Sequence, residues 1–199
     1  MATRAKAKKR PAAKRAAVRK TTAKKPAAKK RTAERRSLVE YKRKRDFTTT
    51  AEPVARRAPR RKEELPIFVV QHHKASHDHH DFRLEHDGVL LSWAVPKHVS
   101  TDPTVKRLAV QVEDHPLDYA TFQGSIPEGE YGAGTVKTWD IGTYEPEGDF
   151  AEGLEKGKLS FVLHGKKLKG DWTLVRMQPR PGERPGKPQW LLMRHHLTK

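Results

Sequence analysis

Short apolar or alternating segments, separated by turn residues, follow one another along the chain from residue 67 onward. Such segments are typical of β-strands, and no long stripe with a helical period competes with them. Asp87-Gly88 stands between two of the segments and predicts a tight hairpin turn. The expected strands cover residues 67–70, 79–86, 89–95, 107–112, 135–139, 159–163, 172–177 and 190–193. We therefore predict a mainly β fold, a compact closed or nearly closed barrel of about eight strands.

The first 62 residues lack this pattern and differ in charge from the rest of the chain. They hold 25 of the 42 Lys and Arg residues but 4 of the 24 Asp and Glu residues, so their net charge is +21 and that of residues 63–199 is −3. Residues 1–31, rich in Lys, Ala and Pro, cannot supply a packed core and are expected to be disordered. Residues 32–62, here called the lead-in segment, are expected to hold one short helix and a linker before the barrel domain of residues 63–199.

The basic tail predicts a polyanionic partner, because each neutralised phosphate releases condensed counterions. We expect it to bind DNA or RNA without sequence preference. A solubilising tail, a nuclear-import-like signal and a transit peptide are the alternatives. The tail residues expected to contact nucleic acid are Lys8, Lys9, Arg10, Lys14, Arg15, Lys24, Lys25, Lys29 and Lys30.

Composition excludes several classes of protein. The chain has no cysteine, so it has no disulfide framework, no thiolate zinc site and no thiol nucleophile. No stretch approaches the roughly 18 apolar residues of a membrane span. We expect a soluble protein of a reducing compartment with no membrane partner.

Residues 71–85 concentrate histidine, carboxylate and arginine side chains. Alternate residues of a strand share a face, so His79, Asp81 and Arg83 should point one way and Phe82 and Leu84 the other. In a small barrel we expect the apolar face to pack under an outer cover and the polar face to line the mouth.

Two imidazoles and a carboxylate suit Mn²⁺, Zn²⁺ or Fe²⁺ with coordination positions left open. His79 and Asp81, with a third ligand at His73 or His77, therefore predict a metal site. The alternative is a solvated histidine tract. Arg83 is placed to hold a phosphate oxygen beside the metal, or else to form an ion pair with Asp81 or Glu85.

Two further segments carry candidate chemistry. His115 precedes Pro116 at the acidic end of a strand, and Tyr119 follows, so the pair could serve proton transfer and oxyanion stabilisation, or form an ordinary turn. Residues 124–134 contain four glycines without the spacing of a phosphate-binding loop, and we expect a structural bend between strands.

Taken in order, these motifs resemble the 3′-phosphoesterase domain of bacterial DNA ligase D over about residues 38–196. The matching runs are Leu38-x-x-Tyr41-x-x-Lys44-Arg45-Asp46-Phe47-x-x-Thr50-x-Glu52-Pro53, Gln71-x-His73-x-Ala75-Ser76-x-x-His79-x-Asp81-Phe82-Arg83-Leu84-Glu85, Ser92-Trp93-Ala94-Val95-Pro96-Lys97, Arg107-Leu108-Ala109-Val110, Val112-Glu113-Asp114-His115-Pro116-Leu117-Asp118-Tyr119, Ile126-Pro127-x-Gly129-x-Tyr131-Gly132-Ala133-Gly134 and Trp190-Leu191-Leu192-Met193. The chain departs from the family at His77, Asp78 and His80, where a basic residue, Leu and Tyr are common. His77 and His80 therefore offer extra ligands for a metal.

The resemblance implies a compact β-barrel and a Mn²⁺-dependent enzyme, with Zn²⁺ or Co²⁺ as alternatives. Such an enzyme removes 3′-terminal ribonucleosides and 3′-phosphates from DNA, leaving the 3′-OH needed for ligation in non-homologous end joining. By position it implies metal ligands His73, His79 and Asp81, catalytic residues His115, Arg83, Arg107 and Tyr119, and substrate-binding residues Lys97, Gln71, Glu113, Arg45, Asp46 and Glu52.

The implied partners are DNA 3′ ends, Ku and a separate ATP-dependent ligase or polymerase. The chain is expected to be a cytoplasmic, nucleoid-associated monomer, either free-standing or a fragment of a longer ligase. Two rival functions remain open: a non-catalytic DNA-end-binding protein with a structural metal, and a cupin-like metal oxygenase.

Overall fold

The computed structural model of the chain describes residues 38–58, 64–179, 182 and 186–195. The tail residues predicted to bind DNA, and the predicted disorder of residues 1–31, lie outside these ranges. The strands are β1 (Ile67–Lys74), β2 (Asp78–His86), β3 (Val89–Val95), β4 (Arg107–Gln111), β5 (His115–Pro116), β6 (Gly124–Ile126), β7 (Gly134–Pro146), β8 (Lys158–His164), β9 (Lys169–Arg176) and β10 (Gln189–Arg194). The helices are residues 38–43, the 3₁₀ helix η1 (Leu117–Thr121) and α2 (Phe150–Lys156).

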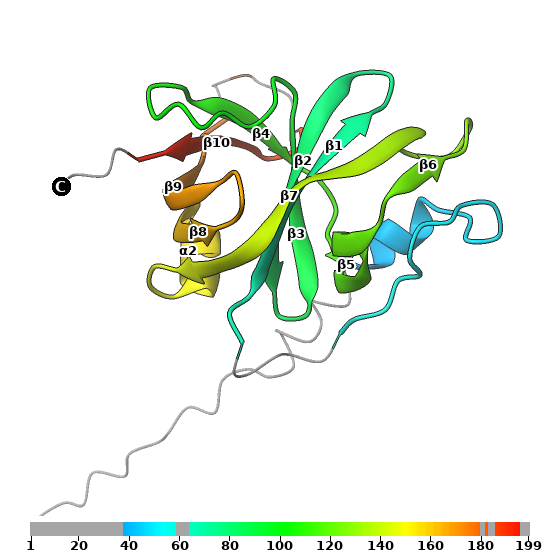
Figure 1. Ribbon diagram of the computed structural model, residues 1–199, viewed down its shortest axis with the longest axis horizontal. Coiled ribbons are helices and arrows are strands. Elements are labelled where there is room, and N and C mark those ends of the chain that lie inside the picture. Colours follow the sequence, from blue (N-terminus) through cyan, green and yellow to red (C-terminus); the bar gives the residue numbers. More distant parts are fainter. Residues whose placement is uncertain (1–37, 59–63, 180–181, 183–185, 196–199) are drawn as a thin grey trace, which may run out of the picture.

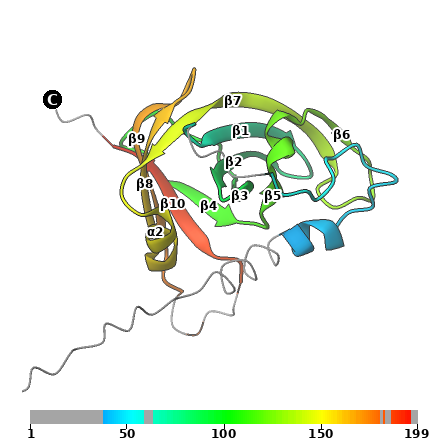
Figure 2. The ribbon, with the colours of Figure 1, turned by 90° about the horizontal axis from the view of Figure 1, so that it is seen from below.

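Eight of the strands close into a barrel, in the order β1-β2-β3-β4-β10-β9-β8-β7 and back to β1 (Figure 1). Every pairing in this ring is antiparallel. The long strand β7 pairs with β6 near its start and with β8 near its end. The helical residues 38–43 and α2 lie at opposite ends of the molecule (Figure 2). The predicted closed eight-stranded barrel is confirmed.

Local sequence explains the turns. Asp87 and Gly88 both have positive φ angles, 52° and 80°, as a two-residue hairpin between β2 and β3 requires. Gly134, at the start of β7, approaches the backbone of Lys74 so closely that an added Cβ would lie 2.2 Å from the Lys74 carbonyl oxygen. The glycine-rich segment therefore forms the predicted bend. The short helix α2 was not expected, although Asp149 caps its N-terminus and Gly157 its C-terminus.

Aromatic side chains fill the barrel interior. Phe82 packs against Trp93 and Phe161, and Trp93 packs against Trp190. Each ring buries a large apolar area, so these contacts are a main source of stability. Phe82 and Leu84 belong to this core, so Asp81 and Arg83, which alternate with them along β2, lie on the opposite face of the strand.

The prediction that the polar face of β2 lines the barrel mouth, with the apolar face under an outer cover, is therefore wrong. The polar face points out of the barrel, and residues 38–58 of the lead-in segment lie over it together with η1. A second apolar cluster that includes Tyr41, Val69, Leu90 and Tyr119 joins this cover to the barrel wall. Among the described residues, no helix has the length and apolar character needed to cross a membrane.

Candidate metal and phosphate site

Three candidate metal ligands meet on the outer face of the β1–β2 hairpin. His73 and His79 are cross-strand partners, and Asp81 follows His79 on the same face. The Asp81 carboxylate lies 3.5 Å from Nδ1 of His73 and 3.6 Å from Nε2 of His79. One ligand atom from each residue lies within 4.8 Å of the other two. The geometry therefore makes His73 the third candidate ligand, whereas His77 lies outside this group.

Backbone carbonyls orient both imidazoles. Nε2 of His73 is 2.9 Å from the carbonyl oxygen of Gly132, and Nδ1 of His79 is 2.7 Å from that of His77. Each ring donates an N–H to its carbonyl, so the nitrogen facing Asp81 carries a lone pair. Three acceptors then converge, and a cation between them stabilises the arrangement. Two imidazoles and a carboxylate fit a divalent transition metal.

Charge at the site is balanced around Asp81. Burial opposes ionisation of Asp81, but the charge of Arg83, followed by the contacts with the imidazoles of His73 and His79, holds its pKa well below the ordinary value. Burial likewise opposes charging of His79, and Asp81 outweighs it and raises the pKa of His79. A proton on His79 therefore offsets the charge of Asp81, and a metal ion at the same position would replace it.

Arg83 is held by three side chains beneath the triad. It donates from Nη2 to Asp81 at 3.0 Å, from Nε to Gln71 at 2.9 Å and from Nη1 to Ser92 at 2.8 Å. Its guanidinium also lies over the ring of Tyr119, 4.8 Å from the centroid. The expected ion pair with Asp81 is present, and these contacts fix the guanidinium beside the metal ligands.

His115 lies on the other side of Ser92. Its Nδ1 is 2.9 Å from the carbonyl oxygen of Glu113 and 3.3 Å from Oγ of Ser92, and its Nε2 is 3.3 Å from Nη2 of Arg45. Arginine is always a donor, so Nε2 accepts and Nδ1 carries the proton. Burial, followed by the charges of Arg83 and Arg45, holds the pKa of His115 well below its usual range. His115 is thus a neutral imidazole with a lone pair on Nε2.

The lead-in segment brings two buried charges onto this network. Arg45 donates to Glu52 at 2.9 Å, and the Tyr119 hydroxyl donates to the same carboxylate oxygen at 3.0 Å. The side chains of Arg45 and Glu52 are 4% and 0% exposed. Their pairing offsets the cost of burying both charges and holds the lead-in segment over His115.

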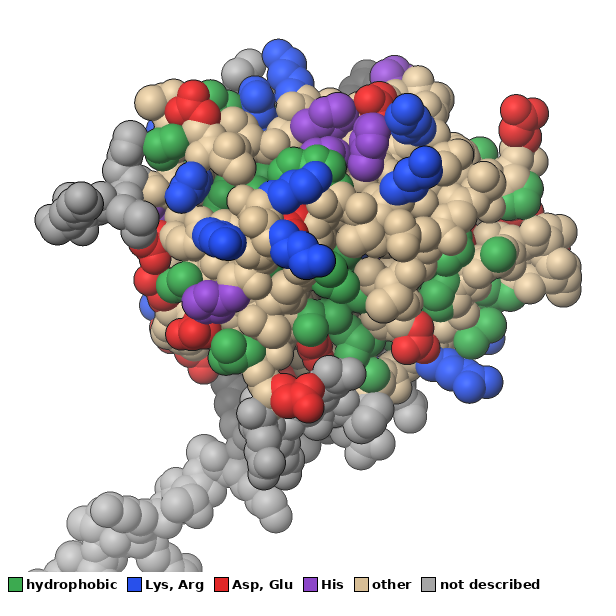
Figure 3. Space-filling model, viewed as in Figure 1, with side chains coloured by type: hydrophobic (Ala, Val, Ile, Leu, Met, Phe, Trp, Pro, Cys, Tyr) green, Lys and Arg blue, Asp and Glu red, His purple; other side chains and the backbone are tan. Residues whose placement is uncertain are grey.

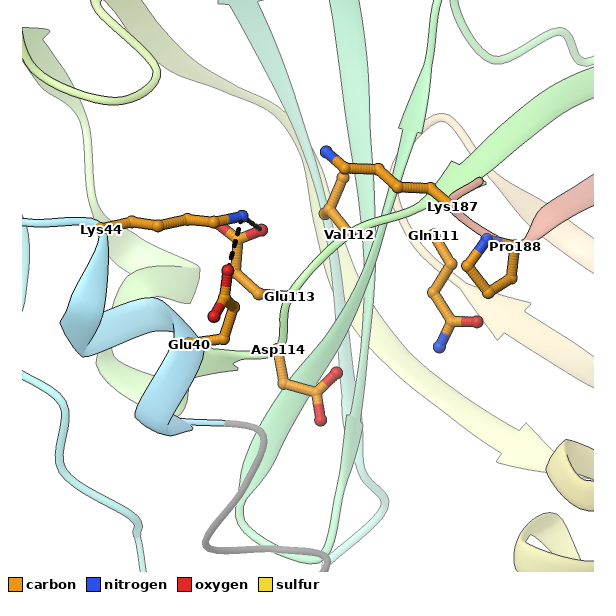
Figure 4. Close-up of a pocket in the computed structure, with 8 residues that line it drawn as sticks. All are labelled: Glu40, Lys44, Gln111, Val112, Glu113, Asp114, Lys187 and Pro188. Carbon is orange, nitrogen blue, oxygen red and sulfur yellow. Dashed lines mark hydrogen bonds and ion pairs between the residues drawn. The ribbon is translucent and has the colours of Figure 1, made fainter. Parts of the chain in front are cut away.

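A cleft opens beside this cover, between the helical residues 38–43 and the β4–β5 connection (Figure 4). Its volume is about 400 Å³. Lys44 contacts both Glu40 and Glu113 on one side, and Lys187 lies across the cleft on the other. Glu113 also lies 3.4 Å from Nη1 of Arg45, so the cleft wall is connected to the His115 network.

A family model described as the DNA ligase D 3′-phosphoesterase domain matches residues 71–176, which span these strands and site residues. The chain belongs to this family. It is similar to the multifunctional non-homologous end joining protein LigD of Pseudomonas aeruginosa, with 55% identity over 159 residues, 80% of this chain and 18% of that protein. Similarity to LigD of Mycobacterium bovis is 48% over 139 residues, 70% of this chain and 18% of that protein. The chain therefore spans about a fifth of the length of these relatives.

The ligase D 3′-phosphoesterase fold brings most of the predicted residues together, but three lie apart. Asp46 is exposed and accepts hydrogen bonds from Thr48. Lys97 is exposed in the connection after β3. Arg107 begins β4, where its Nε is buried and has no hydrogen-bond partner in the part of the chain that the structure describes. The substrate-binding roles of Asp46 and Lys97 and the catalytic role of Arg107 stay predictions.

Ser92 is a member of the network that sequence reasoning missed. Its hydroxyl is fully buried, accepts from Arg83 and donates to the carbonyl oxygen of Leu90. A serine between Leu91 and Trp93, in an otherwise apolar strand, is the signal that marks it. Its position predicts a partner, because a buried hydroxyl without one is costly.

Acid is expected to destabilise this domain through its neutral histidines. Besides His115, burial and the nearby His98 and His72 lower the pKa of His80 to about 4. In the unfolded chain, histidines take up protons below about pH 6.5, whereas His115 and His80 in the folded protein do not. The unfolded state therefore binds more protons, and the free energy of unfolding decreases as the pH is lowered. His79, with a raised pKa, acts in the opposite direction. We expect His115 to account for about 1 kcal/mol of lost unfolding free energy between pH 7.5 and 5.5.

Denaturant titrations in EDTA at the two pH values measure this loss. Substitution of His115 by Asn removes the titrating group, so H115N should lose less stability than the wild type over the same interval. Equal losses in the two proteins would contradict the assignment.

Proposed function

We propose that the chain is a metal-dependent phosphoesterase that heals DNA 3′ ends. The observation that carries the proposal is the convergence of His73, His79 and Asp81 directly beside Arg83, within a family described as a 3′-phosphoesterase domain. Phosphate transfer requires charge neutralisation more than covalent chemistry, and this site combines a cation position with a fixed guanidinium.

The proposed ligands hold Mn²⁺, with Zn²⁺ or Co²⁺ as alternatives. When bound, the ion supplies Lewis-acid neutralisation of a phosphate oxygen. Arg83 orients Asp81, and its guanidinium faces the place proposed for the phosphate oxygen. Its three contacts use one N–H from each nitrogen, and a guanidinium has five, so each terminal nitrogen has a second N–H for a phosphate oxygen. Arg107 and Lys97 supply further positive charge toward the substrate.

His115 and Arg45 form the second half of the proposed site. Nε2 of His115 holds a lone pair that accepts from Arg45, so it can take up a proton or hydrogen-bond to the phosphate. Tyr119 packs against His115 with ring centroids 4.7 Å apart, and burial raises its pKa well above normal. Tyr119 therefore stays protonated and acts as a positioning residue. Gln71 is a positioning residue for Arg83. Its amide nitrogen donates to the carbonyl groups of Tyr119 and Phe122, which fixes the amide oxygen that accepts from Arg83.

The substrate is proposed to be the 3′ end of a DNA primer or duplex. Glu113, Glu52 and Asp46 belong to the cover and the adjoining cleft, where we place handling of a terminal ribonucleoside. The tail, within the +21 segment, would hold the DNA, because a body of charge −3 offers no long-range attraction. End joining would make Ku and a ligase or polymerase its partners, in the cytoplasm at the nucleoid.

A denaturing gel of a 5′-labelled primer–template with one 3′ ribonucleotide tests the proposal. With Mn²⁺ we expect stepwise conversion to a 3′-phosphate and then a 3′-OH, and no conversion in EDTA. Conversion of a preformed 3′-phosphate alone would restrict the function to a phosphatase. No product from folded, metal-loaded protein would favour a DNA-end-binding protein instead.

A further inference from the structure

Histidines also gather on the opposite face of the β1–β2 hairpin. We propose that His72, Asp78 and His98 form a second binding site for a divalent transition metal. One ligand atom from each of the three lies within 4.8 Å of the other two. Nε2 of His72 is 2.6 Å from one carboxylate oxygen of Asp78, and Nε2 of His98 is 3.5 Å from the other. One carboxylate therefore bridges two imidazoles that belong to different parts of the chain.

The two sites use opposite faces of the same hairpin. His73 pairs with His79, whereas the adjacent His72 pairs with His80, and adjacent residues of a strand point to opposite faces. Asp78 shares the face of His80, at the open end of the barrel, and His98 enters from the connection after β3. Histidine side chains are visible on the surface near this end, with Lys and Arg side chains around them (Figure 3).

His98 provides the observation that points to a ligand. The His98 side chain is 41% exposed, but its Nε2 atom is buried and has no hydrogen-bond partner among the described residues; the Asp78 carboxylate is the nearest charged group, at 3.5 Å. Buried ring nitrogens rarely lack a partner, because an unsatisfied polar atom is costly. His98 also has a φ of 60°, an uncommon backbone conformation for a residue with a side chain. The loop after β3 therefore places this imidazole nitrogen opposite the Asp78 carboxylate with no other acceptor or donor for it among the described residues.

The surrounding rings make the cluster a built site. His80 is 4% exposed and stacks on His98 with ring centroids 4.4 Å apart, while His72 contacts both rings edge-on. Nδ1 of His80 accepts the backbone N–H of Val99, which fixes the loop that carries His98. His80 therefore acts as a wall of the site rather than as one of its three ligands. The side chains of His72, Asp78 and His98 are 27%, 51% and 41% exposed, so a metal ion can reach them from solvent.

Two imidazoles and one carboxylate favour Zn²⁺, Co²⁺ or Ni²⁺ over Mg²⁺ or Ca²⁺, which prefer oxygen ligands. A metal here would tie the β1–β2 turn to the loop after β3. The same turn positions His73 and His79, so the second ion would stabilise the hairpin that carries the first site without contacting substrate.

Metal stoichiometry tests the proposal independently of DNA-end healing. Untagged full-length protein is titrated with Co²⁺, followed by visible absorbance and elemental analysis. We expect two equivalents in the wild type, one in H79A, one in H98N and none of high affinity in the double variant. Asparagine tolerates the positive φ of His98, so H98N should keep its fold, which circular dichroism checks.

The matched control is H164A, which removes an exposed histidine that pairs with Glu145 at 2.9 Å elsewhere on the barrel. It should retain both equivalents. A melting temperature that rises with Zn²⁺ in H79A but not in H79A/H98N would give a second readout. H98N that binds as much metal as the wild type would overturn the proposal.

Discussion

Replacement of His79 by alanine is expected to lower the rate of 3′-phosphate removal by about a thousandfold or more, because the metal is asked to supply several kcal/mol of transition-state stabilisation. His79 is the most exposed of the three proposed ligands, with 18% of its side chain accessible, against 9% for His73 and 8% for Asp81. Its removal therefore leaves the barrel core and the buried Asp81–Arg83 pair in place. The loss should be in turnover rather than in folding.

Single-turnover rates on a primer with a preformed 3′-phosphate measure the effect, with Mn²⁺ in excess. H164A is the matched control, because it also removes a histidine with a carboxylate partner, and we expect its rate to equal that of the wild type. H79A should still bind one equivalent of metal at the second site. Full activity of H79A would remove the triad from the mechanism.

The triad could be predicted from sequence because its geometry is local. His79 and Asp81 share a face by strand alternation, and a tight connection from β1 to β2 places His73 opposite His79. The hairpin at Asp87-Gly88 is equally local, since a two-residue turn with both φ angles positive selects these residue types. The resemblance to the family predicted the roles of the individual residues, and the pattern of short strands predicted the barrel.

The remaining parts depend on contacts between distant segments. The contact of Arg45 with His115 joins residues 70 positions apart, and no periodicity in the sequence indicates it. His98 approaches Asp78 only because the loop after β3 folds back over the hairpin. The sequence therefore indicates His77 and His80 as extra ligands and gives no sign of His98. The side of the barrel on which the polar face lies was also decided non-locally, by aromatic rings from strands such as β8 and β10 that fill the interior.

Replacement of Arg83 by alanine is expected to reduce the free energy of unfolding by about 3–5 kcal/mol, the usual cost of removing one partner of a buried ion pair. Arg83 is 2% exposed, and its loss would remove the hydrogen bond that it donates to each of Asp81, Gln71 and Ser92. R83K should recover only part of this stability, because an ammonium group cannot reproduce the planar fork that reaches three acceptors. R43A is the matched control: Arg43 also pairs with a carboxylate, that of Glu40 at 2.8 Å, but 69% of its side chain is exposed. Its removal should change stability by less than about 1 kcal/mol.

Urea titrations in EDTA and in Mn²⁺ separate the two roles of Arg83. If the guanidinium chiefly neutralises Asp81, a bound cation takes over that task, and Mn²⁺ should raise the urea midpoint of R83A more than that of the wild type. Restored stability should not restore turnover, because the N–H groups proposed for the phosphate are still missing. An R83A protein as stable as R43A in EDTA would mean that the buried ion pair contributes little. An R83A protein that regains full turnover with Mn²⁺ would mean that Arg83 orients the metal ligand and does not contact the phosphate.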